Sequence, residues 1–343
     1  MSKGVIFDKK NILIIGGAGF VGSHLCDELV KSNKVICLDN FLTGRQSNIS
    51  HLLQSQDFIF INHDIINSLD LVKQPELSGF KIEFQGLQEI YFLASPTSPQ
   101  DYQKYPLETL LVNSVGLRHA LDLAVKYQAK FFYASSPAVY GQTQKIKAVK
   151  EDYLGAVNQL GLRACFEEAK RFGETLVNNY RLRHGLNTKI ARIANCYGPR
   201  LRLADGRMIP EIIRLALKNE AIIIYGDKNS HGSYFFISDL IKGITKLMES
   251  GENGPMNLGS EWKNKFAEIA QKIIAISGSK SEIKFAPVGE LMSTQPLVDI
   301  DLAKAKLGWF PVVLLDEGLT KTIDYLSAQQ GILAADEFSE KVL

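Results

Sequence analysis

The sequence predicts an α/β protein with a doubly wound parallel sheet, and three observations support this prediction. Short apolar runs alternate with helical patterns through the first half of the chain, which indicates parallel βαβ units. The runs are apolar throughout, as expected for strands that helices cover on both faces of a sheet. The first run leads into a glycine-rich turn and a helix, which is typical of a Rossmann-like fold.

The elements of the first half follow from the length and periodicity of its apolar runs. A short apolar run has the length of a buried strand, whereas apolar positions that recur over several turns indicate a helix. Strands are expected at 12–15, 34–38, 58–61, 90–93, 130–134 and 188–193, and helices at 22–31, 107–127 and 163–183. Residues 69–86 lie between two strands and predict a helical or hairpin excursion.

After Gly198 and Pro199 the alternation loosens, and the pattern predicts a smaller mixed α/β lobe. Helices are expected at 209–218, 238–249, 263–277 and 315–326, and strands at 221–225 and 255–258. We expect this lobe over the carboxyl edge of the sheet, where ligands bind in open α/β folds. The polar residues 331–343 are expected to form a tail.

Charge and composition argue against several classes of partner. The net charge is only +2, so we expect no overall attraction to nucleic acid or to an anionic membrane. The four cysteines form no CxxC pair and no cluster with histidine, so no metal site is expected. The thiols are isolated, the N-terminus is unlike a signal peptide, and no apolar stretch approaches the ~20 residues of a membrane helix. These features predict a cytoplasmic protein.

The glycine turn has the spacing of a dinucleotide site. Gly16, Gly19 and Gly22 are spaced GxxGxxG, which lets the backbone turn tightly and a pyrophosphate rest on the helix N-terminus. The next strand ends in Asp39, whose carboxylate can accept hydrogen bonds from both hydroxyls of the adenosine ribose. A carboxylate there repels a 2′-phosphate, so the sequence favours NAD over NADP. The alternative is a tight turn that binds no ligand.

Two further features fit the same dinucleotide cleft, although each also occurs in ordinary loops. Asp64 follows the third strand and is placed to contact the adenine amino group. Leu93, Ala94 and Ser95 end the fourth strand, where small residues let the backbone pass close to a cofactor. The predicted units are an NAD-binding domain over 1–196, to which a segment at about 233–260 returns, and a mainly substrate-binding lobe over 197–330.

Ten segments share their pattern with one enzyme family. They are GGAGFVGS at 16–23, DNFLTGR at 39–45, NHD at 62–64, LASP at 93–96, YP at 105–106, EDY at 151–153, RAC at 163–165, YGPR at 197–200, DGR at 205–207 and AKLGW at 305–309. They resemble the UDP-glucuronate decarboxylases, which belong to the NAD-dependent epimerase/dehydratase family of extended short-chain dehydrogenases/reductases. The resemblance covers roughly residues 10–327 and is more specific for the superfamily than for this branch.

The resemblance implies chemistry at C4 of a sugar. In that family NAD oxidises the C4 hydroxyl of UDP-glucuronate, the 4-keto sugar loses its carboxylate as carbon dioxide, and the cofactor returns its hydride to give UDP-xylose. Epimerases and dehydratases share the first step. The reaction needs a Ser or Thr, a Tyr and a Lys. Ser136 and Lys170 match two of these, and Phe166 stands at the Tyr position.

The resemblance alone implies the remaining contacts. For the cofactor they are Phe20, Val21, Asn40, Phe41, Thr43, Gly44, Ile65, Asn113 and Lys170. For the substrate, in which a UDP-sugar is the favoured nucleotide sugar, they are Ser136, Arg163, Asn195, Arg200 and Arg207. The helices over 107–127 and 163–183 resemble the pair that forms a homodimer interface in this superfamily, or they only cover the sheet.

Four positions depart from the family pattern. Phe166 cannot take or give a proton, and general acid–base catalysis is typically worth ~10²–10⁴-fold in rate. Ala138 replaces a Glu, Gly232 replaces an Arg, and a further Arg is missing near residues 295–298. One engineered substitution would explain Phe166 alone, whereas four departures in one predicted pocket favour natural divergence.

The departures leave two functional classes open. One is an NAD-dependent nucleotide-sugar enzyme with altered or impaired proton transfer, either a decarboxylase or an epimerase or dehydratase. The other is a non-catalytic relative that binds NAD and a nucleotide sugar. An ordinary alcohol dehydrogenase that releases NADH is less favoured, because the second lobe resembles those of sugar-nucleotide binders.

Overall fold

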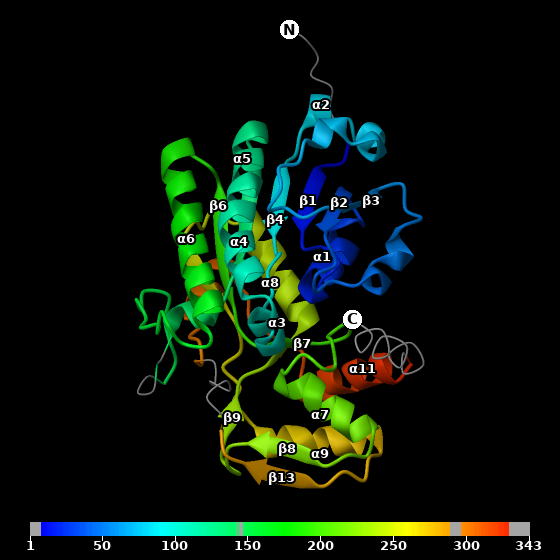
Figure 1. Cartoon of the computed structure of the whole chain (residues 1–343), viewed down its shortest axis with the longest axis vertical. Coiled ribbons are helices and arrows are strands. Elements are labelled where there is room, and N and C mark those ends of the chain that lie inside the picture. Colours follow the sequence, from blue (N-terminus) through cyan, green and yellow to red (C-terminus); the bar gives the residue numbers. More distant parts are fainter. Residues whose placement is uncertain (1–7, 142, 144–146, 289–295, 329–343) are drawn as a thin grey trace.

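A seven-stranded parallel sheet forms the centre of the molecule (Figure 1). The computed structural model describes residues 8–141, 143, 147–288 and 296–328. The strands of the sheet are β1 (Asn11–Ile15), β2 (Lys34–Asp39), β3 (Phe58–Asn62), β4 (Glu89–Phe92), β5 (Lys130–Ser135), β6 (Thr188–Ile193) and β11 (Pro255–Leu258). They lie in the order β11-β6-β5-β4-β1-β2-β3, and all neighbours are parallel. The order reverses beside β1, which confirms the predicted doubly wound, Rossmann-like fold.

Strand β1 is apolar throughout because hydrophobic cores lie on both faces of the sheet. Ile12 and Ile14 belong to the core on one face, and Leu13 and Ile15 belong to the core on the other. This is the burial expected of a central parallel strand, whose successive side chains point to opposite faces.

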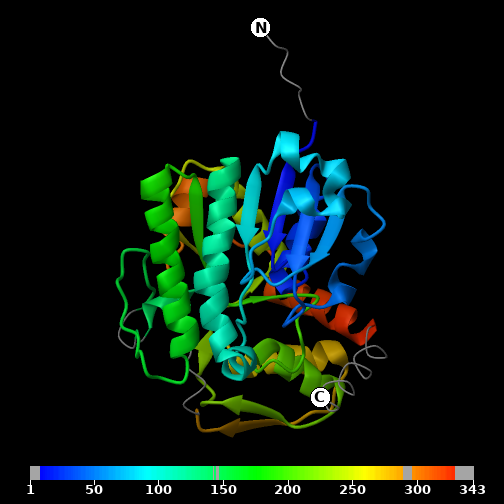
Figure 2. The ribbon, with the colours of Figure 1, turned by 45° about the horizontal axis from the view of Figure 1, so that its top comes forward.

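Helices cover both faces of the sheet. On one face, α1 (Phe20–Leu29) packs against α8 (Ile237–Glu249). On the other face, α5 (Leu117–Tyr127) and α6 (Ala164–His184) lie side by side, as Figure 2 shows. Among the described residues, no helix combines the length and the apolar character that crossing a membrane requires.

Two expected segments differ in detail from the prediction. The helix expected over 107–127 consists of α4 (Pro106–Leu111), a π-helical turn over Val112–Gly116, and α5. The excursion over 69–86 is helical rather than a hairpin, because it forms two short 3₁₀ segments followed by α2 (Ile82–Gln85).

Two helices were not expected, α10 (Asp301–Leu307) and α3 (Pro99–Lys104), and the second bears on the site. Helix α3 follows β4, and Ser98 caps its N-terminus by accepting a hydrogen bond from the backbone N–H of Asp101 at 3.1 Å. The Ser98 hydroxyl in turn donates to the Asp101 carboxylate at 2.6 Å. This reciprocal cap fixes the start of α3 beside the carboxyl end of β4.

A lobe lies next to the carboxyl ends of the strands, at the lower end of the molecule in Figure 1. Its helices are α7 (Met208–Leu217), α9 (Phe266–Ser277) and α11 (Leu315–Ala328), whereas α10 (Asp301–Leu307) packs against β11 and α8 beside the sheet. Its short strand pairs are β7 (Cys196–Tyr197) with β10 (Phe235–Phe236), β9 (His231–Gly232) with β12 (Asn264–Lys265), and β8 (Ile222–Tyr225) with β13 (Ile283–Ala286).

The lobe shares its hydrophobic core with one face of the sheet. Ile213 of α7 and Ile269 of α9 belong to the same core cluster as Ile12 of β1. The chain also returns from the lobe to the sheet, where β11 pairs with β6. The division into an NAD-binding domain and a substrate lobe therefore stays a prediction, and the predicted tail over 331–343 lies outside the described residues.

Candidate active site

A cleft of about 840 Å³ lies between the carboxyl ends of the strands and the lobe. All but three of the residues predicted for the cofactor, the substrate and the catalytic positions line it. They are Gly16, Gly19, Phe20, Val21, Gly22, Asp39, Asn40, Thr43, Asp64, Ile65, Leu93, Ala94, Ser95, Ser136, Arg163, Phe166, Lys170, Asn195, Arg200 and Arg207. The other three, Phe41, Gly44 and Asn113, do not line it.

The glycine turn is packed so closely that Gly16 and Gly22 cannot carry side chains. A Cβ at Gly16 would lie 2.6 Å from the backbone N of Ala94, and a Cβ at Gly22 would lie 2.1 Å from the carbonyl oxygen of Gly16. Helix α1 begins directly after Gly19 with no side-chain cap. Its first backbone N–H groups are therefore available to the phosphates of a dinucleotide.

Asp39 stabilises the glycine turn by hydrogen bonds and also lines the cleft. Its carboxylate accepts hydrogen bonds from the backbone N–H groups of Ala18 at 2.9 Å and Phe41 at 2.8 Å. Burial raises the pKa of Asp39, and these backbone hydrogen bonds oppose the shift. A carboxylate has about four acceptor positions, so acceptor capacity remains for ribose hydroxyls.

The three predicted residues outside the wall support residues that line it. Gly44 packs directly against the Asp39 carboxylate, and the backbone N–H of Phe41 donates to that carboxylate while the Phe41 ring stacks on Phe60. The buried Asn113 donates to the Ser95 hydroxyl at 2.9 Å and accepts from the Tyr133 hydroxyl at 2.9 Å. Asn113 therefore acts on the cleft through Ser95.

Asp64 is held in the cleft lining by two hydrogen bonds. It accepts one from the Asn40 side chain at 3.0 Å and one from the backbone N–H of Ile66, also at 3.0 Å. The carboxylate is therefore fixed beside Asn40, where both residues line the cleft.

Ser136 and Lys170 line the cleft from different elements. Ser136 begins a 3₁₀ turn after β5, and its hydroxyl accepts a hydrogen bond from the backbone N–H of Ala138 at 3.2 Å. Lys170 on α6 donates to the carbonyl of Ala134 at 2.9 Å. Burial lowers the pKa of Lys170 to about 7, and Glu174 opposes part of this shift.

Phe166 lies one helical turn before Lys170 and brings no oxygen to the cleft. Its ring is almost fully buried and stacks on Tyr102 of α3, with ring centres 5.2 Å apart and planes 10° from parallel. Ala138 packs in the same small apolar cluster. Gly232, the third departure, lines the cleft, while Gln295 near the fourth lies outside the described residues.

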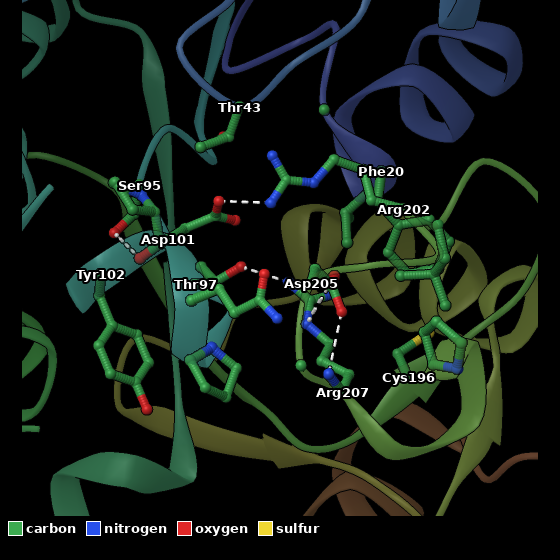
Figure 3. A pocket seen from close by; sticks show the side chains of 18 of the residues that line it. Phe20, Thr43, Ser95, Thr97, Asp101, Tyr102, Cys196, Arg202, Asp205 and Arg207 are labelled. Carbon is green, nitrogen blue, oxygen red and sulfur yellow. Dashed lines mark hydrogen bonds and ion pairs between the residues drawn. The ribbon is translucent and has the colours of Figure 1, made fainter. Parts of the chain in front are cut away.

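The arginines of the cleft already have acidic partners. Arg163 pairs with Glu167 at 3.0 Å and Arg200 with Asp27 at 2.6 Å. Figure 3 shows Arg207 with Asp205, and Arg202 with Asp101 across the cleft. A guanidinium carries five N–H donors, so a paired arginine can still bind a phosphate or a sugar.

The prediction missed several residues of this region, and one sequence signal could have found them. Thr97, Asp101, Tyr102 and Arg202 all line the cleft. The run from Ser98 to Asp101 has the spacing of a capping box, which predicts the start of α3, the helix that carries Asp101 and Tyr102. Within the described part of the chain, no cluster of acidic, His or Cys residues could hold a metal ion.

His24 follows the glycine turn but does not offer a proton donor or acceptor to the cleft. Its Nε2 lies 3.0 Å from the carbonyl oxygen of Pro199. Burial lowers the pKa of His24 to about 4, so the ring is neutral at pH 7 and its N–H donates to that carbonyl. The histidine thereby ties α1 to the loop that carries Arg200.

Comparison with known proteins finds similar proteins that are nucleotide-sugar enzymes. The model of the NAD dependent epimerase/dehydratase family matches residues 12–259. UDP-glucuronic acid decarboxylase 1 of Danio rerio is 38% identical over 335 residues, which cover 97% of this chain and 77% of the relative.

Two solved structures share the fold over nearly their whole length. UDP-glucose 4-epimerase of Thermotoga maritima, solved with UDP-glucose, is 26% identical with a TM-score of 0.80, covering 93% of this chain and 99% of that one. UDP-glucuronic acid 4-epimerase of Bacillus cereus, solved with UDP-glucuronic acid and NAD, is 26% identical with a TM-score of 0.77 at the same coverage. The cofactor named in the family description is the predicted NAD, and this chain belongs to the NAD-dependent epimerase/dehydratase family.

Proposed function

We propose that this chain is an NAD-dependent enzyme that acts on a nucleotide sugar, and that UDP-glucuronate decarboxylation is its reaction. The observation that carries the proposal is that the glycine turn, Ser136 and Lys170 line one cleft. The similarity to UDP-glucuronic acid decarboxylases over 97% of the chain supports the choice of substrate. NAD, when bound, supplies the acceptor for the C4 hydride and later returns it.

Each group of cleft residues would bind a different part of the cofactor or the substrate. The glycine turn and the N-terminus of α1 hold the pyrophosphate, and Asp39 accepts from the adenosine ribose. Ser136 binds the C4 oxygen of the sugar, and Lys170 binds the nicotinamide ribose. Arg163, Asn195, Arg200 and Arg207 bind the nucleotide-sugar phosphates or the sugar.

We infer that proton transfer in this cleft is impaired or altered. Phe166 cannot exchange a proton with the C4 hydroxyl, and the loss of general acid–base help typically costs ~10²–10⁴-fold in rate. A slow reaction would then depend on Ser136 or a bound water.

Product analysis tests the proposal. The protein is incubated with NAD and UDP-glucuronate, and the mixture is analysed for UDP-xylose and for a 4-keto sugar. We expect slow formation of UDP-xylose that Lys170→Met abolishes. Formation of a 4-epimer or a dehydrated sugar instead would identify an epimerase or a dehydratase. No turnover of any UDP-, GDP- or dTDP-sugar would reject the enzyme.

A non-catalytic protein that binds NAD and a nucleotide sugar is the second candidate. The apolar packing of Phe166 with Tyr102 and Ala138 favours it, because nothing in that cluster can exchange a proton readily at pH 7. The two candidates differ in their response to Phe166→Tyr. Restored decarboxylation identifies a blocked enzyme, whereas unchanged binding of both ligands without turnover identifies the non-catalytic protein.

We also propose that the protein is a homodimer through α4 and α6. Leu107, Leu110 and Leu111 of α4 and Phe172 of α6 are large apolar side chains that are exposed in the single chain. Light scattering coupled to size-exclusion chromatography is expected to give twice the chain mass, and Phe172→Glu is expected to give the monomer. A cytoplasmic location remains a prediction from the cysteine usage.

A further inference from the structure

A buried ion pair joins helix α6, which carries Lys170, to the sheet. Glu174 of α6 accepts two hydrogen bonds from the Arg192 guanidinium of β6, one from Nε at 2.9 Å and one from Nη2 at 2.7 Å. Only 15% of the Glu174 side chain and 10% of the Arg192 side chain are exposed. A bidentate pair fixes the direction of both side chains more strictly than a single hydrogen bond does. The pair therefore holds α6 at one position against β6.

The same carboxylate also binds the end of β5, next to a predicted catalytic position. The Ser135 hydroxyl donates to Glu174 at 2.6 Å, and the residue after it is Ser136. Lys170 lies one helical turn before Glu174 and donates to the carbonyl of Ala134 at 2.9 Å. Two side chains of α6 thus bind two consecutive residues of β5. The distance between Ser136 and Lys170 depends on these contacts.

Arg192 extends the contacts to the turn that follows Ser136. Its Nη1 donates to the Tyr140 hydroxyl at 2.9 Å, and the guanidinium lies 4.7 Å from the centre of the Tyr140 ring. Tyr140 ends the 3₁₀ turn that Ser136 begins, and its hydroxyl donates to Asn257 of β11 at 2.7 Å. The ion pair is therefore connected to both sides of Ser136, through Ser135 before it and through Tyr140 after it.

Glu174 also acts on Lys170 by its charge. Burial lowers the pKa of Lys170 to about 7, and the Glu174 carboxylate opposes part of this shift. Because a neighbouring carboxylate favours the protonated amine, loss of the Glu174 charge would leave less of the lysine protonated at pH 7. The protonated amine is the form that offers three hydrogen-bond donors. Glu174 therefore influences both the place and the charge of the lysine.

We propose that Glu174 and Arg192 are positioning residues that set the placement of Ser136 and Lys170 relative to each other. Neither of the two lines the cleft, so they act on a bound ligand through the residues that they hold. The inference rests on the proposed function, in which Ser136 binds the C4 oxygen of the sugar and Lys170 binds the nicotinamide ribose. Chemistry at C4 requires both groups in place at once, and a small displacement of a positioned group lowers the rate strongly.

Two variants test the inference, with Glu89→Gln as a matched control. Glu174→Gln removes the charge with little change in size. Glu174→Leu combined with Arg192→Met replaces the buried pair by apolar side chains of similar volume, a change that is often neutral for stability. Glu89 is also a buried carboxylate that accepts hydrogen bonds from a lysine and from a tyrosine hydroxyl. It begins β4, at the edge of the sheet opposite the cleft.

Calorimetry compares two pairs of ligands, and each pair differs in the part that Lys170 or Ser136 would contact. ADP lacks the nicotinamide ribose of NAD, and UDP lacks the sugar of UDP-glucuronate. For both Glu174 variants we expect about fivefold weaker binding of NAD and of UDP-glucuronate, the typical effect of one lost hydrogen bond, with ADP and UDP unchanged. For Glu89→Gln we expect a lower melting temperature and unchanged affinities for all four ligands.

A Lys170→Met background shows whether the effect on NAD passes through the lysine. In that background Glu174→Gln should weaken NAD binding no further, because the contact that it positions is already lost. A second fivefold loss of NAD affinity would mean that Glu174 acts on the cofactor by another route, and it would overturn the inference.

The ligand pairs also distinguish failure of this inference from failure of the proposed function. Unchanged NAD and UDP-glucuronate affinities in Glu174→Gln overturn the inference, and so does an equal loss for ADP and UDP, which would indicate general damage to the cleft. If the unsubstituted protein binds no nucleotide sugar, the proposed function fails, and the comparison of NAD with ADP still decides the role of the pair at Lys170. Thermal melting confirms that each variant is folded, and Glu174→Gln alone decides if the double variant is not.

Discussion

Lys170 is buried in a site that disfavours the protonated, charged form of its amine. Burial lowers its pKa to about 7, whereas an unfolded chain keeps lysine near its ordinary pKa of about 10.4. Unfolding therefore takes up a proton between about pH 7 and pH 10. Because the unfolded state binds more protons in this window, stability rises with pH across it, and the cost of burying the charge is fully present below pH 7.

Lys170→Met should remove this pH dependence, since methionine fills a similar volume without a titrating group. Relative to the variant, the unfolding free energy of the unsubstituted protein should rise by up to about 1.4 kcal/mol per pH unit between pH 7.5 and pH 10. Urea unfolding at several pH values measures both proteins without cofactor. Parallel profiles would contradict the buried, neutral lysine.

Gly22 has no room for a methyl group. A Cβ there would lie 2.1 Å from the carbonyl oxygen of Gly16, so Gly22→Ala must displace the start of α1. We expect NAD affinity to fall more than about tenfold and the protein to lose about 2 kcal/mol of stability. Gly79→Ala is the control, because a Cβ at Gly79 meets nothing within 4 Å. NAD titration and urea unfolding measure both variants, and wild-type binding by Gly22→Ala would argue against the assigned pyrophosphate site.

The helices show what an apolar pattern can and cannot predict. The range expected for helix 107–127 is close to the observed one, because its apolar face recurs at helical spacing. The π-helical turn over Val112–Gly116 inside it was not predicted. The turn places Asn113 between Ser95 and Tyr133. Contacts of this kind, with residues distant in sequence, cannot be predicted from the local pattern of apolar residues. Such turns often occur near functional sites.

Asn113→Leu tests what this turn supports. The substitution leaves the Tyr133 hydroxyl buried without its acceptor, which should cost about 2 kcal/mol of unfolding free energy. The Ser95 hydroxyl also loses its donor, so NAD affinity should fall by roughly threefold or more. Ser114→Ala, in the same turn, removes only local hydrogen bonds to Leu110 and Leu111 and should change stability by less than about 0.5 kcal/mol. Equal effects of the two substitutions would contradict a specific role for Asn113.

Over the whole molecule, local sequence patterns predicted those cleft residues that belong to a single strand–turn–helix unit. The glycine turn and Asp39 are of this kind, whereas Lys170 was predicted only from the family resemblance. Arg202 and Asp101 are not, because they meet across the cleft from positions 101 residues apart, and their pairing depends on how the lobe docks on the sheet. The place of Tyr102 over Phe166 likewise depends on the packing of α3 against α6, which no local pattern encodes.

The segment over residues 309–313, here called the C-terminal segment, is bound to α8 mainly through Asp239. Asp239 of α8 accepts hydrogen bonds from the backbone N–H groups of Val312 and Val313, both at 2.9 Å, and its backbone carbonyl accepts from the Trp309 indole at 2.8 Å. Asp239 is almost fully buried. Losing this carboxylate leaves two backbone donors unsatisfied in the segment between α10 and α11.

Asp239→Ala should therefore destabilise the protein by about 3 kcal/mol while unfolding stays a single transition. One transition is expected because the core that contains Trp309 continues from β1 into α7 and α9. The measurement compares urea unfolding by tryptophan fluorescence, in a Trp262→Phe background that leaves only Trp309, with unfolding by far-ultraviolet circular dichroism. Coincident curves support one cooperative unit. A fluorescence change that precedes the loss of secondary structure would show that the C-terminal segment and the lobe separate from the sheet before it unfolds.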